Sequence, residues 1–170
     1  MYKGIVFLDI DGVLNSHTYC DELIAIHGED GFHKLPRWER HLSTKRIKII
    51  NNICKDSNLV VVVSSTWRTG KTVDWLQDTL NARGATFKII DKTGHEDCKI
   101  RGVEIYKWLD KNITLEEHGV SSQHFYPYVI LDDDSDMLLW QQENFFKCDN
   151  YTGITPTHEY VIKRYFDKFK

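Results

Sequence analysis

Residues 5–15 read IVFLDIDGVLN, and this stretch decides the fold. An unbroken apolar run, typical of a strand buried on both faces of a parallel sheet, leads into Asp9 and Asp11, and Gly12 then ends the run. Side chains two apart on a strand point to the same side, so the two carboxylates are expected to converge. Carboxylates that close repel each other unless a proton or a cation lies between them. We therefore interpret the stretch as the start of a Mg²⁺-assisted catalytic site.

The bulk composition is that of an ordinary globular protein. The chain has 170 residues, of which 41% are hydrophobic and 28% are charged, and this length suits one domain with a sizeable core. We expect a single domain over residues 1–170. The net charge of −3 provides no overall positive field that would attract nucleic acid or an anionic membrane, although a local basic patch stays compatible with it.

The cysteines and the N-terminal residues indicate the compartment. Cys20, Cys54, Cys98 and Cys148 are scattered and include no C-x-x-C pair, so we expect reduced thiols rather than a disulfide or zinc framework. The first residues lead straight into the predicted strand without a signal-peptide pattern, and the apolar runs are too short to span a bilayer. These features predict a cytoplasmic protein that has no membrane partner.

Apolar runs and amphipathic segments alternate along the chain. Residues 15–41 are the exception, because they look irregular, with a short helix at 21–27. Alternation of strands and helices predicts an α/β fold, a three-layer sandwich around a mainly parallel central sheet. The predicted strands are 3–10, 59–64, 87–90, 128–131 and 145–148, and the predicted helices are 44–55, 72–83, one from 101 and one that follows the cap residue 155.

Polar side chains follow three of the predicted strands at the point where each strand ends. In open α/β sheets, ligands bind at the carboxyl ends of the strands, near the point where the strand order reverses. Acids from two strands could share an octahedral Mg²⁺, which prefers carboxylates, waters and phosphate oxygens. The polar pairs are Asp9 with Asp11, Ser64 with Ser65, and Asp132 with Asp133.

The order of these motifs resembles the haloacid dehalogenase (HAD) superfamily, whose members are mostly phosphatases. Residues 9–12 (DIDG) match its first motif, and Ser64 after a valine-rich strand matches its second. Arg101 or Lys99 is placed for the third motif, and residues 132–133 (DD) match the fourth. The resemblance implies a HAD-like Rossmannoid fold and a Mg²⁺-dependent phosphohydrolase that acts on phosphomonoesters.

The resemblance covers residues 3–136 and extends to finer features. Residues 64–68 (SSTWR) and 101–109 (RGVEIYKWL) are similar to a small branch of uncharacterised phosphatase-like domains, and some relatives of that kind belong to nucleic-acid repair proteins. The intervals in which the superfamily often inserts a cap domain hold only short segments here, so we expect no large cap. An open site favours a large substrate, such as a nucleic-acid end or a phosphoprotein.

The superfamily's mechanism can be carried over to matching positions. It implies that Asp9 is the nucleophile and forms an aspartyl-phosphate, and that Asp11 protonates the leaving alcohol and then activates water. Asp9, Asp132 and the backbone carbonyl of Asp11 would hold Mg²⁺, and Asp133 would complete or orient the metal ligands.

Two supporting assignments have alternatives. Ser64 would donate a hydrogen bond to a phosphoryl oxygen, but Ser65 takes this role if the strand ends one residue later. Arg101 would place positive charge beside the transition state, but the third motif is most often a lysine, which leaves Lys99 as a second candidate.

Two other classes of function are alternatives to the phosphatase. A receiver-like signalling domain also has acids after its first strand, but it needs a phosphate-accepting aspartate where this chain has Ser64. A noncatalytic Mg²⁺- or phosphate-binding module is the other alternative. The substrate, a small molecule or a nucleic-acid end, is left open. We interpret Trp67 as a core residue and Asp134 and Asp136 as parts of a solvated turn.

Overall fold

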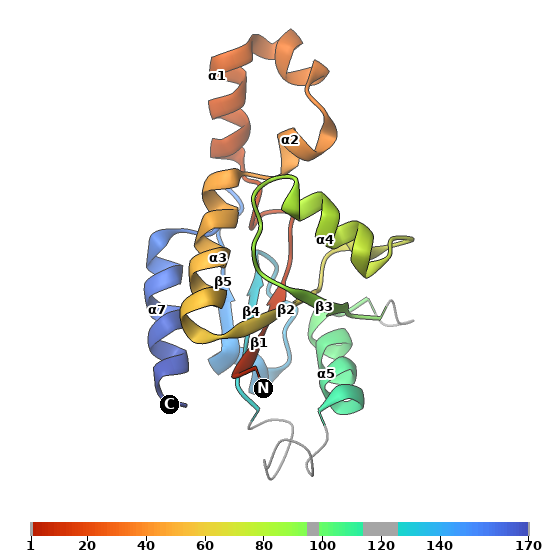
Figure 1. Cartoon of the computed structure of the whole chain (residues 1–170), viewed down its shortest axis with the longest axis vertical. Coiled ribbons are helices and arrows are strands. Elements are labelled where there is room, and N and C mark those ends of the chain that lie inside the picture. The colour runs from red at the N-terminus through yellow and green to blue at the C-terminus, as the bar shows by residue number, and fades with distance from the viewer. Residues whose placement is uncertain (1, 95–98, 114–125, 170) are drawn as a thin grey trace.

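A parallel sheet with the strand order β3-β2-β1-β4-β5 lies at the centre of the structure (Figure 1). The computed structural model describes residues 2–94, 99–113 and 126–169, and Cys98 lies outside them. The four pairings between neighbouring strands are all parallel, as the unbroken apolar runs predicted. The strands are β1 (Gly4–Leu8), β2 (Leu59–Val63), β3 (Ile89–Lys92), β4 (Tyr128–Asp132) and β5 (Phe145–Lys147).

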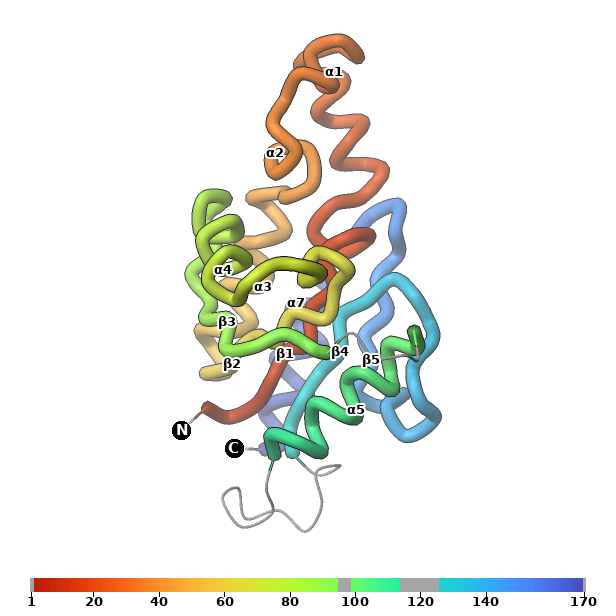
Figure 2. Tube along the Cα trace, turned by 90° about the vertical axis from the view of Figure 1, so that its right-hand side faces the viewer, coloured from red at the N-terminus to blue at the C-terminus, as the bar shows by residue number. Residues whose placement is uncertain are grey.

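Helices cover both faces of this sheet and complete three layers (Figure 2). Val6 and Leu8 of β1 pack into one apolar cluster, whereas Ile5 and Phe7 pack into a second cluster on the opposite face. The predicted three-layer α/β sandwich is therefore confirmed. The first cluster includes residues of α3 (Thr44–Ser57), α4 (Val73–Asn81) and α7 (Pro156–Asp167), and the second includes residues of α5 (Arg101–Asn112).

The strand order reverses between β1 and β4. From β1 the chain builds outward through β2 to β3, and it then returns to place β4 on the other side of β1. Leu8 pairs with Leu131 at the ends of these two strands, and the Asp9 amide donates a hydrogen bond of 2.9 Å to the Leu131 carbonyl oxygen. This register brings Asp9 beside Asp132, at the point where such sheets bind their ligands.

Two helices project beyond the carboxyl ends of the strands (Figures 1 and 2). They are α1 (His17–Lys34), which bends at Gly28 with φ +69°, and α2 (Arg37–His41). The expectation that residues 15–41 are mostly irregular is wrong, whereas the short helix expected at 21–27 is present as part of α1. Tyr19 is the one buried residue among the described residues of these two helices, so neither helix carries the apolar stripe by which sequence periodicity predicts a helix.

A buried arginine holds the start of this projection. Arg46 of α3 donates hydrogen bonds of 2.7 Å to the hydroxyl of Ser16 and to the carbonyl oxygen of Thr152. Its guanidinium also lies 5.7 Å from the ring centroid of Tyr19. Because Arg46 joins the N-cap of α1 to the loop before α7, the projection has a defined position over the sheet.

Candidate active site

Three carboxylates converge where β1 and β4 end. Oxygen atoms of Asp9, Asp132 and Asp133 all lie within 4.8 Å of one another. Asp9 is 6% exposed and Asp132 is 2% exposed, so two of the three acids are buried. Carboxylate oxygens in this arrangement are suitable ligands for a hard divalent cation.

The surroundings of these acids favour their protonated forms when no cation is bound. Burial raises the pKa of Asp9 to about 7, and repulsion by Asp132 adds to this rise, while a hydrogen bond from Ser65 and the charge of Arg101 oppose it. Burial likewise raises the pKa of Asp132 to about 6, against the hydrogen bond from the Asp134 amide. A cation that binds here must therefore displace protons.

Arg101 is the cation that the fold brings to this cluster. Its Nε donates a hydrogen bond of 3.2 Å to Asp132, and its Nη2 lies 4.0 Å from Oδ1 of Asp9. The Arg101 amide also donates to Asp136 at 2.7 Å, so Asp136 fixes the first residue of α5 and is more than part of a solvated turn. Lys99 is exposed and forms no ion pair with a described residue, so the geometry favours Arg101 for the third motif.

The two serines after β2 have different partners. The Ser65 hydroxyl donates a hydrogen bond to the Asp9 carboxylate and accepts one of 3.4 Å from the Trp67 amide. The Ser64 hydroxyl accepts a hydrogen bond of 3.5 Å from the Thr93 hydroxyl. β2 ends at Val63, one residue before the predicted end, and it is nevertheless the second serine that contacts the acids.

The Asp11 carboxylate lies beside the cluster and has its own donors. Trp67 Nε1 donates to both of its oxygens, at 3.1 and 3.2 Å, and Asn15 Nδ2 donates at 2.8 Å. Strand alternation predicted that Asp9 and Asp11 converge, but β1 ends at Leu8, and the partners of Asp9 in the cluster come from β4 and the residue after it. The interpretation of Trp67 as a core residue is incomplete, because its indole N–H donates hydrogen bonds to Asp11.

Comparison with known families agrees with this geometry. The sequence model of a family described as the HAD domain in Swiss Army Knife RNA repair proteins matches residues 5–158. The chain belongs to this HAD family. No curated protein and no solved structure matches the chain significantly. The predicted HAD resemblance and its Rossmannoid fold are thereby confirmed, and membership supports a hydrolase of the phosphatase type that uses a metal ion. In the described part of this HAD domain, no helix is long and apolar enough to cross a membrane.

A buried ion pair supports the site of this HAD domain and was not predicted. Oε2 of Glu104 accepts hydrogen bonds from Arg68 at 2.6 Å and from Arg101 at 3.3 Å. The side chains of Arg68 and Glu104 are each 4% exposed. Arg68 also donates to the carbonyl oxygens of Ser65 and Thr93, at 2.5 and 3.1 Å. The spacing of Arg101 and Glu104, three apart on one helix, was the available signal.

Gly12 gives Asp133 the space to join the cluster. Gly12 has φ +72°, and a Cβ atom at this position would lie 2.3 Å from Cγ of Asp133. A side chain at residue 12 would be both strained and in collision with the carboxylate. The glycine of the first motif is thus required by the approach of the fourth motif in this HAD domain.

Proposed function

We propose that this HAD domain hydrolyses phosphomonoesters through an aspartyl-phosphate formed on Asp9, with Mg²⁺ as its metal ion. The observation that supports the proposal is the convergence of Asp9 with Asp132 and Asp133 within 4.8 Å, beside the guanidinium of Arg101. A nucleophile, a set of metal ligands and a cation for the phosphoryl group are then present in one place. The match to a HAD family agrees with this chemistry.

The residues of the cluster fit Mg²⁺. Asp9, Asp132 and Asp133 offer oxygen ligands, which this ion prefers. Among the described residues, Arg101 is the one cation within salt-bridge distance of Asp9 and Asp132. Three ionised acids beside one arginine leave an excess of negative charge that a divalent cation would balance. When bound, Mg²⁺ would withdraw charge from a phosphoryl oxygen and ease the approach of an anionic nucleophile. The backbone carbonyl of Asp11 stays a proposed further ligand.

In the first step, a carboxylate oxygen of Asp9 attacks phosphorus as the bond to the leaving alcohol breaks. Asp11 gives a proton to the leaving oxygen, and Asp9 becomes an aspartyl-phosphate. Arg101 and the Ser65 hydroxyl stabilise the charge that develops on the phosphoryl oxygens. We assign this role to Ser65 rather than Ser64 because the Ser65 hydroxyl already contacts Asp9.

In the second step, Asp11 accepts a proton from a water molecule that attacks the phosphorus. The bond between phosphorus and the Asp9 oxygen breaks, which releases inorganic phosphate and restores both acids. Trp67 and Asn15 keep the Asp11 carboxylate in one orientation through both steps.

We further propose that the phosphomonoester is a nucleic-acid end. The support is the family description, which places matching HAD domains in RNA repair proteins. A terminal phosphate on an RNA strand is a phosphomonoester, so the same two steps would remove it.

The test is hydrolysis of p-nitrophenyl phosphate with Mg²⁺ and with a chelator. We expect turnover that requires the metal and that Asp9→Asn abolishes without a change in the circular dichroism spectrum. Asp134→Asn is the matched control, because Asp134 is exposed and contributes its backbone amide rather than its side chain to Asp132. Rapid acid quenching should also reveal a phosphoryl group on the peptide that contains Asp9.

Two results would contradict the proposal. Retained turnover in Asp9→Asn would remove Asp9 as the nucleophile. Binding of Mg²⁺ without turnover of any phosphomonoester would favour the noncatalytic module instead.

A further inference from the structure

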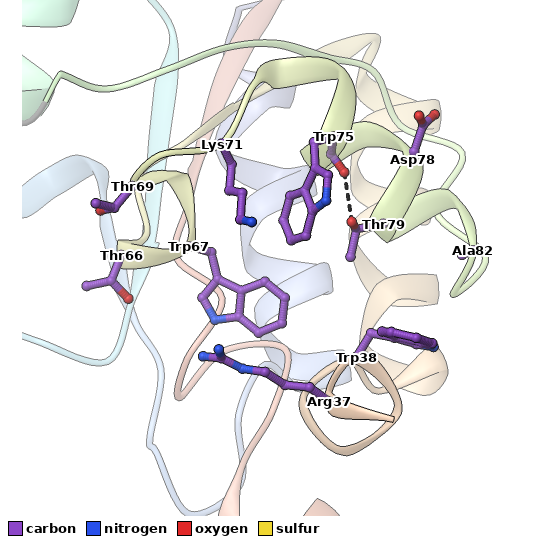
Figure 3. Close-up of a pocket in the computed structure, with 10 residues that line it drawn as sticks. All are labelled: Arg37, Trp38, Thr66, Trp67, Thr69, Lys71, Trp75, Asp78, Thr79 and Ala82. Atoms are coloured by element: carbon purple, nitrogen blue, oxygen red, sulfur yellow. Dashed lines mark hydrogen bonds between the residues drawn. The ribbon is translucent and has the colours of Figure 1, made fainter. Parts of the chain in front are cut away.

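A cavity of about 560 Å³ lies between α2 and α4, and three indole rings line it (Figure 3). Trp38 comes from α2, Trp67 from the short helix η1 (Thr66–Arg68), and Trp75 from α4. Arg37 and Lys71 add two cations to the lining. The volume falls within the range of about 300–1,000 Å³ that is usual for ligand pockets.

The cavity adjoins the proposed acid of the reaction. The ring of Trp67 lines the cavity, while its Nε1 donates to both oxygens of Asp11. Thr66 lines the cavity as well and lies 3.5 Å from Asp11 through its hydroxyl. Because Asp11 is proposed to protonate the leaving oxygen, the cavity lies on the side of the site that receives the leaving group.

The aromatic lining offers surfaces for a flat ring. Trp38 is 50% exposed and Trp75 is 40% exposed, which is uncommon for such large apolar side chains. In Figure 3 the rings of Trp67 and Trp75 both border the open space. Proteins bind single-stranded nucleic acids by stacking bases on aromatic side chains in this way.

The cations of the lining are available for a second anionic group. Lys71 Nζ lies 4.5 Å from the ring centroid of Trp75, and Arg37 Cζ lies 5.7 Å from that of Trp67. Neither Arg37 nor Lys71 forms an ion pair with a carboxylate in the described part of the chain. The proposed catalytic step uses neither cation.

We propose that this cavity binds the base of the nucleotide that carries the terminal phosphate, and that Lys71 and Arg37 receive the next phosphate of the strand. The proposal rests on the proposed phosphatase function and adds the subsite that selects its substrate. A phosphotyrosine side chain would also present a flat ring. It brings no second phosphate, however, so the two cations favour a nucleotide.

The test compares kcat/KM for phosphorylated nucleotides with kcat/KM for glycerol phosphate, which has no ring. The nucleotides are a nucleoside monophosphate and ribodinucleotides phosphorylated at the 3′ or the 5′ end. In Trp75→Ala we expect the ratio for each good nucleotide substrate to fall about tenfold, the loss of one stacking contact. In Lys71→Gln we expect the ratio to fall for the dinucleotide more than for the monophosphate. Trp140→Ala removes an exposed indole outside the cavity. It should leave the ratio unchanged for the monophosphate and for the dinucleotides.

Several outcomes would overturn the proposal. An unchanged nucleotide ratio in Trp75→Ala is one, and a phosphotyrosyl peptide that outperforms the nucleotides and depends on Trp75 is another. If Trp75→Ala does not fold, Trp38→Ala replaces it.

The cavity and the reaction can be tested apart. If the wild-type protein hydrolyses no phosphomonoester, the proposed function fails. Quenching of tryptophan fluorescence by the same nucleotides then tests whether the cavity binds them. Binding that is lost in Trp75→Ala would support the subsite, and binding that is equal in both proteins would overturn it. Hydrolysis of glycerol phosphate without any preference for nucleotides would leave the phosphatase standing and remove the subsite.

Discussion

The indole Nε1 of Trp67 donates to both carboxylate oxygens of Asp11, at 3.1 and 3.2 Å. This donor orients the group that is proposed to move the proton. Trp67→Phe keeps an aromatic ring and removes the N–H donor, so we expect kcat for p-nitrophenyl phosphate to fall about tenfold, a part of the usual contribution of general acid–base catalysis. Trp140→Phe is the matched control, and a Trp67→Phe variant with the activity of that control would contradict the orienting role.

Substitutions of the two serines after β2 should affect different properties, one the activity and the other the stability. Ser65→Ala removes a hydroxyl that contacts Asp9, so we expect kcat to fall about a hundredfold, as for other donors to a developing charge. Ser64→Ala removes a hydrogen bond to Thr93, so we expect the free energy of unfolding to fall by about 1 kcal/mol and the activity to change little. Steady-state kinetics and urea unfolding measure the two effects, and the reverse pattern would return the phosphate-binding role to Ser64.

Gly12→Ala should weaken metal binding. The new Cβ atom would collide with the Asp133 carboxylate, and the backbone with φ +72° would be strained by about 1–3 kcal/mol. Gly28→Ala is the matched control, because Gly28 has φ +69° and open space around it. We expect both variants to lose stability, but only Gly12→Ala to lose affinity for Mg²⁺ in isothermal titration calorimetry. Equal affinities in the two variants would show that Asp133 does not matter for the metal.

The buried ion pair of Arg68 and Glu104 should stabilise the fold only when both partners are present. Glu104→Gln leaves the buried guanidinium without its carboxylate, so we expect the free energy of unfolding to fall by about 3 kcal/mol. Glu22→Gln breaks an exposed ion pair with Lys45 and should cost less than about 1 kcal/mol. Arg68→Met combined with Glu104→Met should recover part of the loss, which a double-mutant cycle measures. No difference between the two glutamate variants would contradict this account.

The buried acids predict opposite pH trends with and without metal. Burial raises the pKa of Asp9 to about 7 and that of Asp132 to about 6, both above the ordinary 3.8. At pH values between the ordinary and the raised pKa, the folded protein holds protons that the unfolded chain has lost. The stability of the metal-free protein should therefore fall as the pH rises from about 4 to 7.

Metal binding should strengthen over the same range. Affinity for Mg²⁺ should rise by up to about tenfold per pH unit for each proton displaced. Thermal unfolding at several pH values, with chelator or with Mg²⁺, measures both trends, and Asp9→Asn should flatten them. If the stability of the metal-free protein instead rises from pH 4 to 7, and Asp9→Asn removes that rise, the raised pKa values would be contradicted.

The parts that were predicted correctly depend on local patterns. An apolar run that stops at Asp9, and another that stops at Asp132, mark buried strands with acids at their carboxyl ends. A helix that begins at Arg101 was expected because apolar residues recur along one face, and the order of these motifs led to the HAD superfamily. The full length of α1 was missed, and only its part at 21–27 was expected, because this helix buries almost nothing.

The sequence by itself determined which chemical groups stand at the strand ends and therefore the class of reaction that we propose. An apolar run that stops at an acid is a local property, and it is sufficient to put Asp9 and Asp132 at or beside the carboxyl ends of two strands. The tertiary structure decided the partners of those groups, because partners come from segments that are distant in the chain. Arg68 and Glu104 are 36 residues apart, and Trp67 and Asp11 are 56 apart. Packing of η1 against the turn after β1 gave Asp11 its donor, and the same packing made Trp67 part of the lining of the cavity.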